Sequence, residues 1–193
     1  MSAGDLTVPT GNGALEHPLR VDCYVRPTVP TAVEDVLEAV ADRLEELRDD
    51  GVVDEYRIVP WPPDGPAIDG NGSARDGLMD AFEDWAERRG YSLEPGFRRR
   101  EVPPSPLRAD GDSLERVRVP LVALALYEAT DGDDRAGATL RGVVPHAERT
   151  DAGATRTYTV GEWLSAAERN GTAVGESPGA ARDEQVPIPE GGQ

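Results

Sequence analysis

The chain has 193 residues, of which 37 are acidic and 20 basic, so its formal net charge is -17 at pH 7. This length fits one domain of ordinary size with terminal tails. The single cysteine, Cys23, excludes an internal disulfide and a CxxC metal or redox pair. No stretch approaches the ~18–20 apolar residues of a membrane-spanning helix, so we expect no membrane association.

The choice of charged residues is as informative as their number. Every basic residue is an arginine, and lysine does not occur. Lysine stems expose apolar surface, whereas short carboxylates hold water and cations. At molar salt the Debye length falls to ~3 Å, which screens the self-repulsion of an acidic surface. The composition therefore predicts a halophilic protein that works in a salt-rich cytoplasm.

Both ends of the chain lack hydrophobic periodicity. Residues 1–19 are rich in Gly, Pro and Thr, and residues 170–193 are rich in Gly, Ala and Pro, a composition typical of disorder. The first residues also lack the charged and apolar regions of a signal peptide, so we expect a cytoplasmic location. We predict a disordered tail at each end and a single domain over residues 20–169.

The domain is predicted to begin with a strand, a helix and a second strand. Residues 20–26 alternate apolar and polar side chains, which is typical of a half-buried strand. Thr31 and Glu34 have the spacing of a capping box, and the apolar residues that follow recur every three or four positions up to Gly51. Residues 52–61 are rich in β-branched and aromatic residues, so this succession predicts a parallel crossover unit.

A second helix and two further strands follow. Ser73 with Asp76 resembles a helix start, and the large apolar side chains over residues 78–86 predict a helix packed on the sheet. Residues 97–102 predict a short strand, and residues 116–127 predict a long one. Because the long segment is apolar on both faces, we expect it to be the central strand.

The predicted domain ends with a weaker strand over residues 138–146 and a short helix capped by Thr159 and Glu162. The sequence thus predicts an α+β fold with a mixed β-sheet of about five strands, in the order β-α-β-α-β-β-β-α. We expect the two longer helices to pack on one face of this sheet, in a ferredoxin-like arrangement.

Four segments together resemble a known protein family. They are VDCYVR, the helix ending in DDGVVDEYRIVPW, AFEDWAERRGYSLEPGFRRREV and VRVPLVALALYE. In these segments the chain resembles a family of small haloarchaeal proteins that commonly carry the label "HTH domain protein", over about residues 20–168. The resemblance implies a cytosolic α+β protein, and it implies no particular activity and no catalytic residue.

The sequence contains none of the common catalytic or nucleotide-binding motifs. Its two Gly-Asn-Gly triplets lack the remainder of a phosphate-binding loop, and Cys23 lies on the apolar face of its strand, which predicts a buried, inert thiol. His146, at a predicted strand end, is interpreted as structural. The aspartates of the 131–134 turn lack the spacing of an EF-hand and are interpreted as solvated. We therefore expect no cofactor, no metal site and no catalytic residue.

The sharpest anomaly in the sequence is a local reversal of charge. Arg98, Arg99 and Arg100 directly follow Phe97 in a chain that is otherwise strongly acidic. These residues could contact a phosphate, a carboxylate ligand or single-stranded nucleic acid, with Phe97 as a stacking platform. Alternatively, one arginine forms an ion pair with an acidic helix while the others protect a strand edge. The second interpretation is favoured, because phosphate contacts weaken steeply as the salt concentration rises.

Two functional hypotheses follow. The first is a non-catalytic module that binds an unknown partner protein or small ligand, because convergent polar catalytic residues are absent from the sequence. The alternative is a regulatory protein that binds DNA or RNA through Arg98, Arg99 and Arg100, as the family label suggests. An enzyme that uses His146 with a carboxylate ranks third.

Overall fold

The computed structural model describes residues 19–63, 74–102, 114–128, 138–150 and 153–175. The elements within these ranges are, in chain order, β1 (Leu19–Val25), α1 (Thr31–Asp49), β2 (Glu55–Pro60), α2 (Ala74–Arg89), β3 (Tyr91–Ser92), β4 (Arg98–Val102), β5 (Leu114–Arg118), β6 (Val122–Glu128), β7 (Thr139–Val144), β8 (His146–Arg149), β9 (Thr155–Tyr158) and α3 (Val160–Gly175). The α+β class predicted from the sequence is confirmed. No helix within these ranges is long and apolar enough to cross a membrane.

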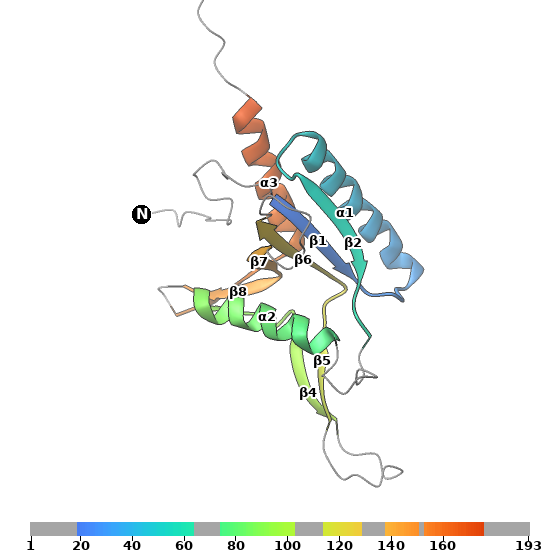
Figure 1. Cartoon of the computed structure of the whole chain (residues 1–193), viewed down its shortest axis with the longest axis vertical. Helices are drawn as coiled ribbons and strands as arrows, with labels where there is room; N and C mark the ends of the chain where they lie inside the picture. Colours follow the sequence, from blue (N-terminus) through green and yellow to red (C-terminus); the bar gives the residue numbers. More distant parts are fainter. Residues whose placement is uncertain (1–18, 64–73, 103–113, 129–137, 151–152, 176–193) are drawn as a thin grey trace, which may run out of the picture.

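The main sheet has four strands in the order β2-β1-β6-β7 (Figure 1). β1 pairs with β2 in parallel, and α1 connects them, so the predicted crossover unit is confirmed. β6 pairs antiparallel with both β1 and β7, which makes the sheet mixed. β6 is therefore an inner strand, and it is apolar on both faces as the sequence predicts.

Helices cover both faces of the main sheet. One core joins β1 and β6 to α1 and α3; its members include Leu44, Leu47, Leu124, Leu126, Trp163 and Leu164. A second core joins the same two strands to α2; its members include Tyr24, Met79, Phe82, Trp85 and Ala125. Since alternate residues of a strand point to opposite faces, α2 lies across the sheet from α1 and α3.

This arrangement differs from the expected packing of α1 and α2 on a single face. The apolar side chains of α2 are large and aromatic, and they meet aromatic residues such as Tyr24 on their side of the sheet. The helix that lies beside α1 is α3. Arg43 of α1 forms an ion pair with Glu168 of α3, with 2.5 Å between Nε and Oε1. Helix partners of this kind depend on long-range contacts and are not encoded in local periodicity.

The long strand expected over residues 116–127 is in fact two strands. β5 ends at Arg118 and β6 begins at Val122, and Pro120 lies between them. Proline has no N–H to donate to a strand ladder, so the chain leaves one partner here and takes up another. β5 pairs with β4 as a separate two-stranded ribbon, which lies at the lower end of the molecule in Figure 1.

The C-terminal part of the domain also differs from expectation. The segment expected as one strand over residues 138–146 contains β7 and the start of β8, and β8 pairs with β3 and β9 in a small third sheet. α3 continues to Gly175, so the boundary expected after residue 169 falls inside a helix, and β1 already begins at Leu19. The ranges 1–18 and 176–193, where tails were expected, lie outside the described residues.

Candidate nucleic-acid interface

The β4–β5 ribbon carries pairs of arginines on one face. In its antiparallel register, Arg98 lies opposite Arg118 and Arg100 lies opposite Arg116. Directly opposite residues of an antiparallel pair project from the same face, and residues two apart share that face. All four side chains are exposed to solvent. We call these four residues the arginine face of the ribbon.

The arginine face concentrates positive charge. Like charges placed directly opposite each other on two strands destabilise the pairing. In the part of the chain that the structure describes, no carboxylate lies within ion-pair distance of Arg98, Arg100 or Arg118. The chain has an excess of 17 acidic residues, yet these three exposed positions are arginines. Their positive charge is therefore available to an external anion.

Arg99 projects from the opposite face of the ribbon and has a different role. Its guanidinium donates to both oxygens of Glu83 on α2, at 2.9 Å from Nε and 2.5 Å from the second nitrogen. Asp80, one turn earlier on α2, lies 3.8 Å away. This is the ion pair with an acidic helix that the sequence offered as the alternative interpretation, and it applies to Arg99.

Phe97 is buried, which corrects its expected role as a stacking platform. Its side chain is 3 % exposed and packs edge-on against Trp61 and Phe82, with ring centroids 5.9 and 6.1 Å apart. A ring enclosed in this way presents no open face to a nucleotide base. Phe97 instead anchors the start of β4 to the aromatic core beneath α2, and this fixes the position of the arginine face.

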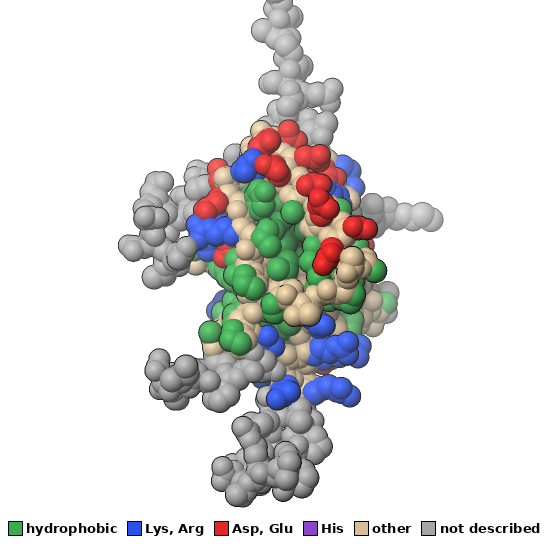
Figure 2. Space-filling view, turned by 90° about the vertical axis from the view of Figure 1, so that its right-hand side faces the viewer, with side chains coloured by type: hydrophobic (Ala, Val, Ile, Leu, Met, Phe, Trp, Pro, Cys, Tyr) green, Lys and Arg blue, Asp and Glu red, His purple; other side chains and the backbone are tan. Residues whose placement is uncertain are grey.

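On one face of the molecule the charge changes sign along the long axis. Figure 2 shows carboxylates gathered on the upper part of one face and arginine side chains gathered on the lower part. Figure 1 places α1 at the upper level and the ribbon at the lower level. The exposed acidic residues of α1 and its C-cap are Glu34, Asp35, Glu38, Asp42, Glu45, Glu46, Asp49 and Asp50. On the face shown in Figure 2, the charge therefore changes from mostly negative in the upper part to positive in the lower part.

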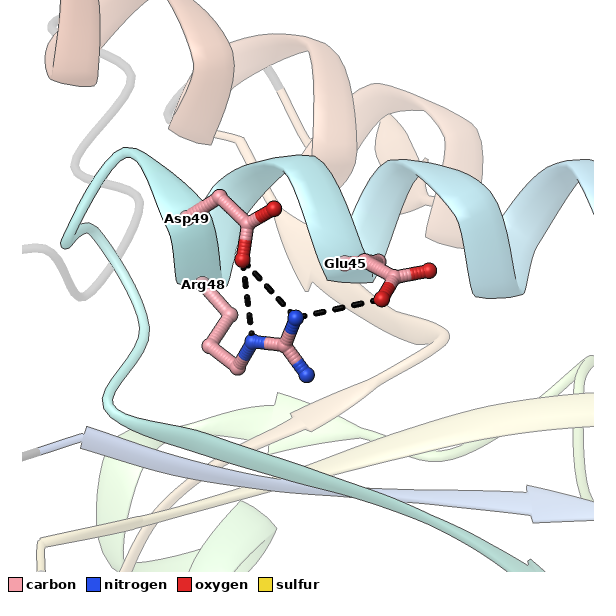
Figure 3. A network of polar contacts seen from close by, with 3 residues as sticks. All are labelled: Glu45, Arg48 and Asp49. Atoms are coloured by element: carbon pink, nitrogen blue, oxygen red, sulfur yellow. Dashed lines mark hydrogen bonds and ion pairs between the residues drawn. The ribbon is translucent and has the colours of Figure 1, made fainter.

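Arg48 on α1 shows how an arginine is neutralised elsewhere in this chain (Figure 3). Its guanidinium donates to Asp49 Oδ1 at 3.1 and 2.8 Å and to Glu45 Oε1 at 3.1 Å. These bonds, the one to Asp49 first, raise the pKa of Arg48. Such a paired guanidinium has little to offer an external anion, in contrast to Arg98 and Arg100.

The other candidate residues lie in enclosed surroundings. His146 is 8 % exposed, its Nδ1–H donates to the Val143 carbonyl at 2.7 Å, and its ring stacks on Tyr158 with centroids 5.0 Å apart. Cys23 is 1 % exposed, and burial raises the pKa of its thiol to about 12. These surroundings agree with the structural histidine and the inert thiol expected from the sequence.

Metal chemistry receives no support from the described ranges, in which no group of three or more His, Cys, Asp or Glu side chains is placed to hold an ion. The aspartates of the 131–134 turn lie outside those ranges. A pocket of about 290 Å³ between α2, β3 and β4 is lined by Glu83, Glu87 and Glu94 among others. Arg98 and Arg99 also line it, so its lining carries both signs of charge.

Sequence reasoning identified half of the arginine face and missed the other half. The sequence singles out Arg98 and Arg100, whereas Arg116 and Arg118 fall within the predicted long strand and are not singled out. A signal was present, because Arg-x-Arg spacing at strand periodicity occurs on both sides of the segment that joins β4 to β5. Two such motifs around one connection indicate a shared face if the strands pair.

A comparison with protein families matches residues 14–172 to a family described as a helix-turn-helix domain. The chain belongs to this helix-turn-helix domain family. The matched range includes the whole β4–β5 ribbon. Searches of curated proteins and of solved structures gave no match.

The family description and the observed topology differ in one respect. In the described ranges α1 and α2 are separated by β2, and no short turn joins two helices as it does in a helix-turn-helix motif. Within those ranges, the arginine face of the ribbon is better suited than any helix to meet a polyanion.

Proposed function

We propose that this chain binds duplex DNA in a regulatory role, through the arginine face of the β4–β5 ribbon. The observation that carries the proposal is the register that sets Arg98 against Arg118 and Arg100 against Arg116. Such like-charged pairs weaken the ribbon in isolation. A polyanion laid against this face would turn the same arrangement into favourable charge-assisted contacts.

Duplex DNA suits the shape of the ribbon. The major groove of B-DNA is about 12 Å wide and admits a two-stranded β-ribbon. Arginine contacts both phosphate oxygens and the O6 and N7 acceptors of guanine, so one face can both position the protein and contact base edges. The deep, narrow major groove of A-form RNA does not admit side chains in this way, and the proposal is therefore made for DNA.

The negative net charge of the chain limits how DNA can approach. The acidic α1 lies away from the ribbon (Figure 1), whereas α2, which also carries exposed carboxylates, packs beside it through the Arg99–Glu83 ion pair. An approach with the ribbon in front therefore avoids the repulsion of α1. At high salt both this repulsion and the phosphate contacts are screened. A set of several arginines is consistent with work in a salt-rich cytoplasm, which the lysine-free composition also supports.

The module that binds a partner protein or small ligand, which the sequence alone favoured, becomes the second candidate. Membership of a helix-turn-helix domain family and the register of the ribbon both support DNA binding over it. A non-enzymatic role is consistent with that family, and the proposal assigns no catalytic residue.

The test is the binding of a fluorescently labelled duplex to the full chain, measured by anisotropy over a range of KCl concentrations. The double variant Arg98→Gln/Arg100→Gln should weaken binding by at least about tenfold at low salt and reduce the salt slope by about two, because each lost phosphate contact removes about one. The matched control is Arg48→Gln/Arg149→Gln, which changes two exposed arginines outside the ribbon. It should bind like the unmodified chain. Equal effects of the two double variants, or no binding at any salt, would refute the proposal.

A further inference from the structure

A small pocket lies beside the ribbon, where the chain leaves the carboxyl ends of β1 and β2. Its volume is about 250 Å³, and three of its lining residues are arginines from three segments: Arg26 follows β1, Arg75 lies in the first turn of α2, and Arg118 ends β5. This volume is below the ~300–1,000 Å³ typical of sites for whole small molecules. The pocket is therefore sized for a single small group.

Backbone carbonyls hold two of these arginines in place. The Arg26 guanidinium donates to the carbonyl of Val119, in the segment between β5 and β6. The Nε–H of Arg75 donates to the carbonyl of Pro62 at 2.8 Å. Among the described residues, no carboxylate lies within ion-pair distance of Arg26 or Arg118. The pocket thus combines two guanidinium groups held by backbone carbonyls, those of Arg26 and Arg75, with a third arginine, Arg118.

Trp61 supplies an independent indication of a ligand. It lines the pocket, its side chain is 2 % exposed, and its ring stacks on Tyr24 with centroids 4.9 Å apart. Its indole Nε1 is buried and has no hydrogen-bond partner within the described part of the chain. Buried N–H groups in native proteins are almost always paired, since an unpaired donor is costly. Because this nitrogen itself is buried, an acceptor in the pocket would pair with it after a small shift of the ring toward the pocket.

We propose that this pocket binds a phosphate group. Its oxygens are all acceptors, and they would receive hydrogen bonds from the three guanidinium groups, the Thr28 hydroxyl and the Trp61 indole. The inference deepens the proposed function, because Arg118 belongs to both the pocket and the arginine face of the ribbon. The phosphate can come from the backbone of bound DNA or from a free phosphate monoester.

The first arm of the test uses inorganic phosphate and the full chain, at an ionic strength held constant with KCl. Saturable broadening of the ³¹P line should give a dissociation constant that rises at least about tenfold in Trp61→Phe and in Arg75→Gln, since each removes one hydrogen bond to a charged group. Arg48→Gln should bind as the unmodified chain does. Lack of saturable binding, or unchanged binding by both pocket variants, would overturn the proposal. Thermal melting reports whether Trp61→Phe folds, and Arg75→Gln decides the question if it does not.

The second arm identifies the source of the phosphate and separates this inference from the proposed function. If the pocket receives a backbone phosphate, Arg75→Gln lowers the salt slope of duplex binding by about one, and inorganic phosphate competes with the duplex. If it receives a free monoester, Arg75→Gln weakens phosphate binding and leaves duplex binding unchanged. Arg98→Gln/Arg100→Gln should retain phosphate binding in either case. Phosphate binding by a chain that binds no duplex would reject the proposed function and support the pocket.

Discussion

The arginine residues of this chain differ in whether a carboxylate lies beside them. This difference determines which of them can bind an external anion. Arg98, Arg99 and Arg100 are consecutive, yet Arg99 is held by Glu83 while its two neighbours project from the other face of the ribbon. Strand periodicity predicts that the middle residue of the run points away from the others. It does not predict which face meets α2, because that depends on how the ribbon packs against the helix.

His146 predicts a pH dependence of stability. Burial lowers the pKa of its imidazole, against smaller opposing effects of the Val143 carbonyl and Glu148. In the unfolded chain the pKa of histidine lies near ~6.5, so the unfolded state takes up a proton first as the pH falls. The free energy of unfolding should therefore decrease as the pH falls below about 6.5, until the folded-state pKa is reached.

This dependence is measured by chemical denaturation at several pH values between about 7.5 and about 5.5, a window above the usual pKa values of carboxylates. His146→Phe, which keeps an aromatic ring in the cluster with Tyr158, should flatten the decrease. The control is His17→Phe, which changes the only other histidine. A decrease of the same size in His146→Phe would show that another group is responsible.

Two sequence segments of this chain have the same helix-start pattern, and only one of them forms a capping box. At Thr159 the backbone N–H donates to Glu162 at 2.8 Å, and the Glu162 N–H donates to the Thr159 hydroxyl at 3.3 Å. At Thr31 the helix has already begun, because Pro30 is its N-cap and makes no side-chain capping bond. Thr31 is therefore a helical residue, and its expected box with Glu34 is not observed.

This contrast predicts different effects for two equivalent substitutions. Thr159→Ala should lower the free energy of unfolding by about 1 kcal/mol, the usual effect of losing an N-cap side chain. Thr31→Ala should change it much less, because no capping bond is lost there. Urea denaturation of the two variants checks the difference. The pKa of Glu162 is lowered by its bonds from Thr159, and it should rise in Thr159→Ala. Equal destabilisation by both substitutions would contradict the assignment of the caps.

At the scale of the whole molecule, the net charge of -17 predicts that folding depends on salt. Exposed carboxylates crowd α1 on the upper part of the face in Figure 2, and they repel one another most strongly in dilute buffer. Between about 0.1 M and about 1 M salt the Debye length falls from ~10 Å to ~3 Å.

Thermal melting should therefore shift upward over this range of KCl concentrations. A non-ionic osmolyte at matched water activity is the control, since it acts by exclusion from the surface without screening charge. A melting temperature that is the same in dilute buffer and in molar KCl would contradict the halophilic interpretation of the composition.

The sequence by itself determined the local features of this protein. Periodicity and turn chemistry predicted α1, its end at Gly51, where φ is +71°, and the parallel pairing of β1 with β2. They also predicted the apolar β6 as an inner strand and the burial of Cys23. The helix and its end depend on residues that are close together in the chain. The parallel pairing follows from the order strand, helix, strand, and the inner strand and the buried thiol follow from apolar patterns within single strands.

Tertiary structure alone decided the candidate sites. The arginine face requires β4 and β5 to pair in one register, and the pocket brings Arg26, Trp61, Arg75 and Arg118 together from four separate segments. Tertiary packing also buries Phe97 and places α2 across the sheet from α1. Such contacts arise from the packing of whole elements, in which the burial of apolar surface outweighs local preference, and no local pattern specifies them.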